Sequence, residues 1–227
     1  MTELTHKDNL KSDIWNIFTA DPTTGVSVVT IDGTLVYINE QSTRVFFNET
    51  RDPNTLTGRS LYDLDFPREW VDERIQLFEK IKATGEAILL RTVWHGKQQF
   101  SWMSLIDADG DGDKEHVLVI TRRIPATQEA KFFLEGEHEV FNSDFIQLGE
   151  LKSLTPRELE VLALLGQKMS IKEIAGALFR SVKTIENHRE SIGRKLKKTR
   201  GVELSCIAHI AGLNAEDSSR KRIGDED

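Results

Sequence analysis

The chain has 227 residues, of which 38% are hydrophobic and 30% charged, a composition typical of a folded, soluble protein. Its apolar runs are only a few residues long, which excludes a transmembrane helix, and its N-terminal sequence lacks the apolar stretch of a signal peptide. The single cysteine, Cys206, excludes an intrachain disulfide and a thiolate metal cluster. These features predict a cytoplasmic protein.

The formal net charge of −7 is unevenly distributed along the chain. Residues 1–150 carry 15 basic and 26 acidic residues, a net charge of −11, whereas residues 151–213 carry 12 and 6, a net charge of +6. A compact basic segment attached to a larger acidic one predicts two domains with different partners.

The first domain is predicted to be α+β. Residues 1–20 show the apolar spacing of a short N-terminal helical segment. In residues 25–39, two β-branched runs flank Asp32-Gly33, which is a strong hairpin signal. A helical pattern then ends at Gly85, and three further strand-like runs follow. The pattern predicts an antiparallel sheet with helices on one side over residues 21–125.

Residues 126–149 are predicted to form a linker helix. Their phenylalanines give more apolar surface than a solvated linker needs, which leaves two interpretations: packing against the chain's own sheet, or pairing with a second subunit. A DNA-binding domain is predicted over residues 150–214. The polar tail, residues 215–227, is predicted to be disordered.

Three helix starts occur in close succession after Leu154. Thr155-Pro156-Arg157-Glu158 offers an N-cap, a proline at N1 and a capping-box glutamate, and Ser170 to Glu173 repeats the capping box. Ser181 can cap a third helix, which is basic. Short helices joined by a tight turn, with the later one basic, predict an all-α helix-turn-helix domain.

The third helix separates into two faces when its residues are projected at about 100° each. Its apolar stripe contains Ile185, Ile192 and Leu196, and a polar face lies opposite. That polar face has the size needed to enter the major groove of DNA. Glu186 is expected to accept from cytosine and Asn187 to read adenine, and Lys183 is a candidate phosphate contact. The residues assigned to phosphates are Lys172, Thr184, His188, Arg189, Arg194, Lys195 and Lys197. Glu190 can be a solvated partner of Arg194.

Residues Leu154 to Lys198 resemble the DNA-binding domain of the LuxR/GerE family of bacterial transcription regulators. The motifs that carry the resemblance are LTPRE, KEIA and SVKTIENHR, and VELSCIAHIAGL follows as a fourth helix. The resemblance implies that the helix after Phe179 reads DNA and that the fourth helix contributes to a homodimer. It also implies that the residues assigned to base edges are Lys183, Glu186, Asn187 and Glu190. It also makes RNA polymerase a candidate partner.

A phosphorylated receiver domain, common in this family, is excluded because the predicted strands are consecutive and hairpin-linked rather than alternating with helices. Residues 20–124 instead resemble a PAS domain, in the segments VVTIDGTLVYIN, LTGRS and HGKQQFSW. PAS domains bind ligands between sheet and helices or act as dimerisation modules. The pocket candidates are Val28, Phe46, Trp70, Ile75, Phe78, Trp94, Phe100 and Trp102.

No cofactor is expected, although an unidentified PAS ligand remains open. A flavin photoreceptor would need a reactive cysteine in this domain, and the histidines lie at strand ends near turns rather than in a haem pocket. The loop Asp107 to Asp113 starts like a calcium loop, but its twelfth position is Leu118 rather than glutamate, so no metal is predicted.

The sequence therefore predicts a cytoplasmic transcription regulator, not an enzyme. A PAS-like sensor would control sequence-specific binding of double-stranded DNA by a homodimer, without a membrane partner. The alternative is a PAS domain that binds a protein partner or dimerises without any small molecule.

Overall fold

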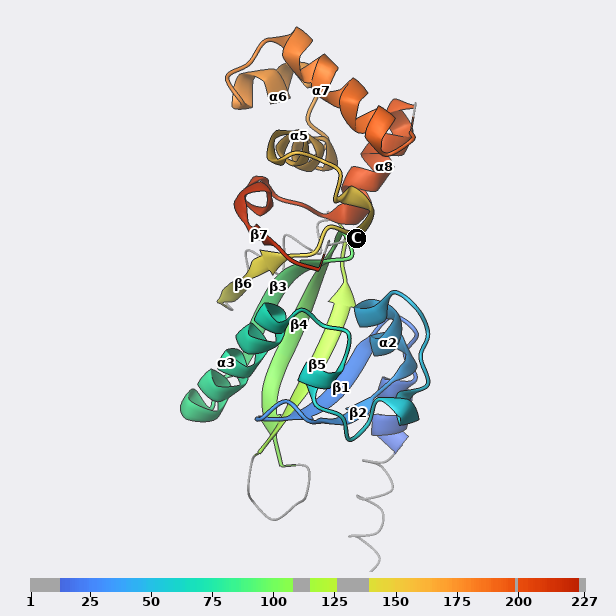
Figure 1. The fold of residues 1–227 in the computed structure, drawn as a ribbon, viewed down its shortest axis with the longest axis vertical. Coiled ribbons are helices and arrows are strands. Elements are labelled where there is room, and N and C mark those ends of the chain that lie inside the picture. Colours follow the sequence, from blue (N-terminus) through green and yellow to red (C-terminus); the bar gives the residue numbers. More distant parts are fainter. Residues whose placement is uncertain (1–12, 108–114, 126–138, 199, 225–227) are drawn as a thin grey trace, which may run out of the picture. The chain divides into compact units, whose positions relative to one another are not determined.

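The computed structural model describes residues 13–107, 115–125, 139–198 and 200–224 (Figure 1). The chain divides into two compact units, one of residues 1–88 and 101–122 and the other of residues 89–100 and 123–227. The division passes through three strands of the sheet. Every helix in the described residues is too short or too polar to cross a membrane.

The strands form one sheet in the order β2-β1-β5-β4-β3-β6-β7. Their bounds are β1 Gly25–Thr30, β2 Leu35–Ile38, β3 Ile88–Trp94, β4 Lys97–Ile106, β5 His116–Arg123, β6 Val140–Ile146 and β7 Lys221–Arg222. The predicted hairpin is confirmed, since β1 pairs antiparallel with β2 across Asp32-Gly33. β3 leads into its neighbour β4 through His95-Gly96. β1 also pairs antiparallel with β5, which joins the first hairpin to the later strands.

Two helices, α2 (Glu40–Phe47) and α3 (Arg68–Thr84), lie on one face of the sheet in the first unit (Figure 1). The predicted end of α3 at Gly85 is confirmed, and that glycine has a φ of 70°, a conformation that other residues adopt at a cost. The sequence did not predict α2. Its N-cap is the buried Asn39, whose Oδ1 accepts from the N–H groups of Ser42 and Val26, each at 2.9 Å. Two short 3-10 segments, Pro53–Thr55 and Leu61–Asp63, connect α2 to α3.

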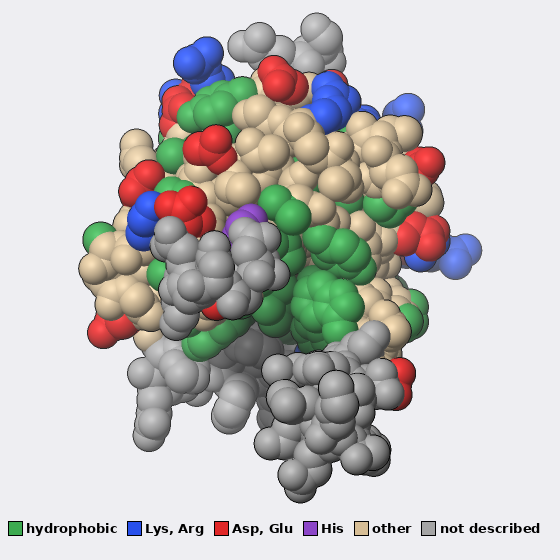
Figure 2. All heavy atoms as spheres, turned by 90° about the horizontal axis from the view of Figure 1, so that it is seen from below, with side chains coloured by type: hydrophobic (Ala, Val, Ile, Leu, Met, Phe, Trp, Pro, Cys, Tyr) green, Lys and Arg blue, Asp and Glu red, His purple; other side chains and the backbone are tan. Residues whose placement is uncertain are grey.

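Residues 13–19 are helical, as predicted for the N-terminal segment, and residues 1–12 lie outside the described residues. Trp15 packs on Tyr37 with ring centroids 5.5 Å apart, whereas Ile14 and Ile17 are 57% and 75% exposed. Figure 2 shows hydrophobic side chains gathered on one face of the molecule, with charged side chains around them. The first unit therefore leaves apolar surface accessible.

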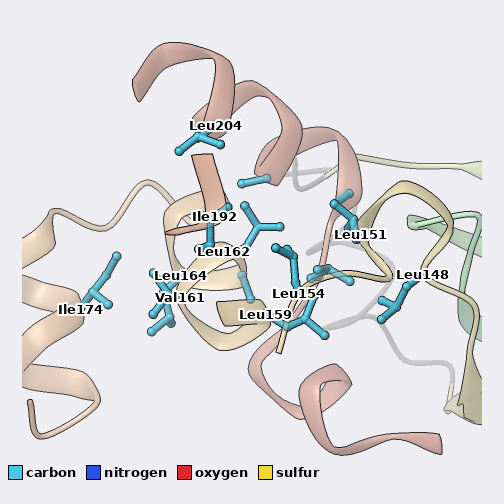
Figure 3. Packing of buried hydrophobic residues seen from close by; sticks show 14 of the residues in the cluster. Leu148, Leu151, Leu154, Leu159, Val161, Leu162, Leu164, Ile174, Ile192 and Leu204 are labelled. Carbon is cyan, nitrogen blue, oxygen red and sulfur yellow. The ribbon is translucent and has the colours of Figure 1, made fainter. Parts of the chain in front are cut away.

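The second unit contains the four predicted helices of the DNA-binding domain. They are α5 (Pro156–Gly166), α6 (Ile171–Ala177), α7 (Val182–Lys195) and α8 (Gly201–Ala211). Apolar residues of all four helices form one core, and Figure 3 shows Leu159, Leu162 and Ile192 turned toward one another within it. Leu148, Leu151 and Leu154 extend the core to the short 3-10 segment Gly149–Leu151 that precedes α5. The helical array therefore shares its core with the chain that leads into it.

The predicted linker helix is wrong over the residues that the structure describes. Residues 126–138 lie outside them, but residues 140–146 form β6, which pairs parallel with β3 through Leu89↔Val140 and Leu90↔Phe141. Val140, Phe141, Phe145 and Ile146 are β-branched or aromatic, which favours a strand. The sequence left two interpretations of this segment, packing against the chain's own sheet or pairing with a second subunit. β6 agrees with packing against the chain's own sheet, since it pairs with β3.

The predicted disordered tail is also wrong for residues 215–224. Ala215–Ser219 form a 3-10 segment, η4, and β7 pairs parallel with β6. Ile223 is buried, and its N–H donates to the carbonyl of Ile146 at 3.0 Å. Residues 225–227 lie outside the described residues. The tail is ordered because its middle carries a buried carboxylate that pairs inside the unit.

That carboxylate belongs to Asp217, which is paired with Arg91 of β3. The Arg91 guanidinium donates from Nη1 to Oδ1 at 2.8 Å and from Nη2 to Oδ2 at 2.7 Å, and both side chains are at most 2% exposed. Arg91 also donates to Gln98 Oε1 at 2.7 Å and to the carbonyl of Gly212 at 3.2 Å. Such a bidentate, fully bonded pair can repay the cost of removing two charges from water.

We expect Arg91→Met to lower the free energy of unfolding by about 3 kcal/mol, because the buried Asp217 loses its bidentate partner and keeps the ion pair with Arg220, at 3.2 Å, and the N–H of Asn214. Adding Asp217→Asn should restore part of that loss, since a buried neutral amide needs less compensation than a buried carboxylate. Urea unfolding followed by circular dichroism measures both. Arg44→Met is the matched control: the Arg44–Glu40 pair is 47% and 56% exposed, and we expect its loss to cost about 1 kcal/mol or less. Equal losses in Arg91→Met and Arg44→Met would contradict this account.

Candidate nucleic-acid interface

The first three helices of the array, α5, α6 and α7, begin at the N-caps that the sequence predicts. Thr155 and Glu158 form the capping box of α5, and Ser170 and Glu173 form that of α6. Ser181 caps α7 by accepting from the N–H of Thr184 at 3.0 Å. These caps satisfy amides that lack partners at a helix start, so the boundaries of all three helices are set locally.

The turn between α6 and α7 is tight and tied to α5. The N–H of Arg180 donates to the carbonyl of Ala175 at 2.9 Å, and Nη2 of Arg157 in α5 donates to the carbonyl of Leu178 at 3.0 Å. Phe179, at the middle of the turn, has a φ of 51° and is 87% exposed. These hydrogen bonds therefore fix the position at which α7 begins, and the surface of the turn stays exposed to solvent.

The inner face of α7 packs as the projection predicts. Ile185 and Ile192 are fully buried, and Leu196 packs against the same core at the end of the helix. Gly193 permits a close approach of the following chain, because a Cβ there would lie 2.6 Å from the carbonyl oxygen of Lys198. Burial of this stripe leaves the opposite side of α7 free of packing.

The buried carboxylate of Glu158 joins α5 to α7. It accepts from the N–H of Thr155 at 2.7 Å, from Ser191 Oγ at 2.7 Å and from Lys195 Nζ at 2.6 Å. Burial alone would raise the pKa of Glu158, but the hydrogen bonds from Lys195, Ser191 and Thr155 outweigh it and lower this pKa to about 2. Sequence analysis recognised Glu158 only as a capping residue and missed its contacts with α7.

The outer face of α7 presents the residues assigned to DNA, with one exception. The exposed ones are Lys183, Asn187, Arg189, Glu190, Arg194 and Lys197, together with Lys172 of α6. Thr184, Glu186 and His188 are partly buried. Lys183 Nζ lies 3.6 Å from Glu186 Oε2, so two of the residues assigned to base edges pair with each other in the free protein. The face thus alternates cationic, amide and carboxylate groups over the length of the helix.

Lys195 is the exception among the residues assigned to phosphates. Its ammonium lies against the Glu158 carboxylate, on the side of α7 that faces α5. Projection at a fixed angle per residue places Lys195 on a flank, but it cannot show that a buried carboxylate on another helix captures the side chain. Lys195 therefore stabilises the array from within.

A cavity lies between the sheet and the helices of the first unit. Its volume is about 40 Å³, and it is lined by residues of β1, β2, α2, α3, β4 and β5 and of the chain between α2 and α3. The lining residues are Ser27, Val29, Leu35, Ile38, Phe46, Phe47, Leu61, Leu64, Phe66, Trp70, Arg74, Phe78, Ser101, Met103 and Val119. The wall is mostly apolar and aromatic, with one buried cation, Arg74.

Three of the eight pocket candidates line this cavity: Phe46, Trp70 and Phe78. The other five, which are Val28, Ile75, Trp94, Phe100 and Trp102, do not. Val28 alternates along β1 with the lining residues Ser27 and Val29, so its side chain takes the other face of the sheet. The same alternation applies to Trp102, which lies between Ser101 and Met103. The candidates were chosen by residue type. The alternation of side chains along a strand excludes Val28 and Trp102 from the cavity wall.

Among the described residues, no group of three or more His, Cys, Asp or Glu side chains lies close enough together to bind a metal ion. The acidic loop that begins like a calcium site extends over residues 108–113, which lie outside the described residues.

Comparison with known proteins agrees with this architecture. Residues 152–208 match the model of the family described as bacterial regulatory proteins, luxR family. The uncharacterised response regulatory protein YgeK of Escherichia coli K12 is 30% identical over 114 residues, which cover 49% of this chain and 78% of YgeK. A crystal structure of the VqmA–ligand–DNA complex of Vibrio cholerae superposes with a TM-score of 0.51 at 16% identity and covers 92% of both chains. The PAS-B domain of Drosophila melanogaster Cycle has a TM-score of 0.34 at 14% identity, covering 44% of this chain and 99% of that one.

The chain belongs to the luxR family of bacterial regulatory proteins. Its fold is α+β, a sheet with helices followed by an all-α helix-turn-helix domain, and this fold is similar to that of VqmA. It is thus a LuxR-type DNA-binding regulator with a PAS-like domain, and the family is one of transcription regulators rather than an enzyme class.

We expect Glu158→Gln to remove an acid-sensitive part of the stability. A carboxylate whose pKa is lowered on folding stabilises the protein above its unfolded pKa, and the contribution is lost as the pH falls through the folded value. For Glu158 that window runs from its ordinary pKa of 4.5 down to about 2, and the shift corresponds to about 3 kcal/mol at neutral pH. Urea unfolding at several pH values measures the difference between wild type and variant.

Glu173→Gln is the matched control, because Glu173 has the same capping role in α6 but lies exposed and bonds to Ser170 of its own capping box. A Glu158→Gln variant whose stability follows the wild-type pH profile would contradict the assignment.

Proposed function

We propose that the chain binds double-stranded DNA as a homodimer, with α7 of each subunit in the major groove of one half-site. The observation that supports this most strongly is the division of α7. Ile185 and Ile192 are fully buried, whereas Lys183, Asn187 and Arg194 on the other side are exposed and unpacked. A helix of this kind, rigidly mounted and basic on its free face, suits groove binding.

Two kinds of contact are proposed for this face. Lys183, Glu186, Asn187 and Glu190 would meet base edges, where an amide suits adenine and a carboxylate suits the amino group of cytosine. The residues that would bind phosphates and fix the register are Lys172, Thr184, His188, Arg189, Arg194 and Lys197. We do not extend the phosphate role to Lys195, since its ammonium is held by Glu158.

The VqmA structure of Vibrio cholerae, whose fold this chain shares, is a complex with a ligand and DNA. That complex supports the proposal that the present chain also couples a ligand at its PAS-like part to DNA binding. In this mechanism the ligand changes the relative placement of two recognition helices, and hence the affinity for a fixed half-site spacing.

A PAS-like part that binds a protein or dimerises without any ligand is the second candidate. The cavity of about 40 Å³ with the buried Arg74 in its wall favours the sensor. The exposed Ile14 and Ile17 of the N-terminal helix favour an additional contact between subunits. We place this function in the bacterial cytoplasm, with RNA polymerase as a further partner.

Binding to double-stranded DNA should be strongly salt-dependent. A protein that neutralises several phosphates loses about 10³-fold or more in affinity between 50 and 200 mM salt. Arg194→Ala should weaken binding to all sequences to a similar extent and reduce the slope of log K against log salt by about 1. Fluorescence anisotropy over a salt series measures both quantities.

Arg68→Ala is the control for that measurement, because Arg68 is an exposed arginine on α3 of the first unit. If Arg68→Ala changed the slope as much as Arg194→Ala does, the proposed interface would be wrong.

Asn187→Ala should relax base preference rather than reduce affinity uniformly. A bidentate contact to one base gives about 1–3 kcal/mol of discrimination, and alanine removes both hydrogen-bonding groups. Selection of bound sequences from a random duplex library, for wild type and variant, should show one position that is specified only by the wild type. Lys197→Ala is the control, since a phosphate contact carries no base information. Identical selected sequences for wild type and Asn187→Ala would refute the readout assignment.

A further inference from the structure

The cavity of the first unit contains an arginine whose hydrogen bonds are largely unused. Arg74 lies on α3, and its side chain is only 7% exposed. Nη1 donates to the carboxylate of the neighbouring Glu73, and the guanidinium lies over the Trp70 ring, 4.5 Å from its centroid. Burial lowers the pKa of Arg74, and the ion pair with Glu73 only partly opposes this shift.

A guanidinium has five N–H donors on two edges, and all of them need acceptors when it is buried. Among the described residues, Glu73 is the one hydrogen-bond acceptor of Arg74. Leaving buried donors without acceptors costs about 1–3 kcal/mol each, and more for charged groups. Since Arg74 also lines the cavity, an acceptor inside the cavity would satisfy the donors that Glu73 does not reach.

The rest of the cavity restricts what such a molecule can be. Phe66 stacks on Trp70 with ring centroids 4.6 Å apart, and Phe46 meets Trp70 edge-on at 5.9 Å, so the walls beside Arg74 are aromatic. The Ser101 hydroxyl pairs with that of Thr121 at 2.9 Å. A volume of about 40 Å³ holds roughly three water molecules, which is far too small for a flavin or a haem.

We propose that this cavity binds a small monocarboxylate with a short apolar body. Its carboxylate would take the free edge of the Arg74 guanidinium, and its hydrocarbon part would lie against Phe66 and Trp70. A planar carboxylate matches the two-donor fork of arginine, and its charge strengthens both hydrogen bonds. This inference rests on the proposed sensor function and names the chemical class of its ligand.

Propionate and propionamide are the probes, because they have nearly the same shape and differ in charge. Titration of the full-length protein with each, followed by nuclear magnetic resonance, should show propionate binding at least about tenfold more tightly, as expected for hydrogen bonds to a charged partner. Equal affinities would overturn the carboxylate assignment in favour of a neutral acceptor. Binding of neither probe would overturn it in favour of a cavity that holds only water.

The variants are Arg74→Met and, because Glu73 would then lose its ion pair with Arg74, the double variant E73Q/R74M. Both should bind propionate and propionamide equally. Arg68→Met is the control, since Arg68 lies on the same helix but outside the cavity lining, and it should keep the wild-type preference. A double variant that folds and still prefers propionate would refute the role of Arg74.

Failure of this proposal is distinguishable from failure of DNA binding. The salt dependence of duplex binding depends on α7, and E73Q/R74M leaves the residues of α7 unchanged. If the variant and wild type bind duplex DNA alike in the absence of propionate and neither prefers propionate, only the ligand assignment is wrong.

Discussion

The buried ion pair between Arg91 and Asp217 is the constraint on which the order of the second unit depends. It joins a strand of the sheet to a residue 126 positions later in the chain. Charges removed from water must be compensated in full, and here Gln98 and the Gly212 carbonyl bind the remaining edge of the guanidinium. The C-terminal segment is therefore held as η4 and β7 rather than left as a polar tail. The chain that follows α8 thus becomes part of the sheet.

A second buried carboxylate, that of Glu158, holds two helices together inside the helical array. It closes the N-terminus of α5 and binds Ser191 and Lys195 of α7, so the same group sets a helix boundary and fixes the neighbouring helix. Because the inner face of α7 is occupied by these contacts and by Ile185 and Ile192, its outer face is free to meet DNA. The proposed DNA contacts and the stabilising contacts thus use opposite sides of α7.

Local signals in the sequence predicted what depends on neighbours in the chain. The capping boxes of α5 and α6, the hairpin at Asp32-Gly33 and the glycine stop of α3 are each set within a few residues, and all were confirmed. What depends on distant partners was missed: the parallel pairing of β6 with β3, the order of residues 215–224 and the capture of Lys195 by Glu158. The pocket was predicted in part, because residue type identifies aromatic side chains but not the face of the sheet they take. Arg74, the charged residue of the cavity, was not among the candidates, since no sequence pattern indicates that a helix arginine is buried.

The central claim is that the outer face of α7 is the DNA-binding surface. Lysine acetylation footprinting by mass spectrometry, with and without duplex DNA, tests it most directly. We expect the reactivity of Lys172, Lys183 and Lys197 to fall when DNA is added, whereas Lys195 stays slow in both states because Glu158 holds its ammonium. Lys82 of α3, which is 47% exposed, should react equally with and without DNA. Protection of Lys82 with no change at Lys172, Lys183 and Lys197 would contradict the account.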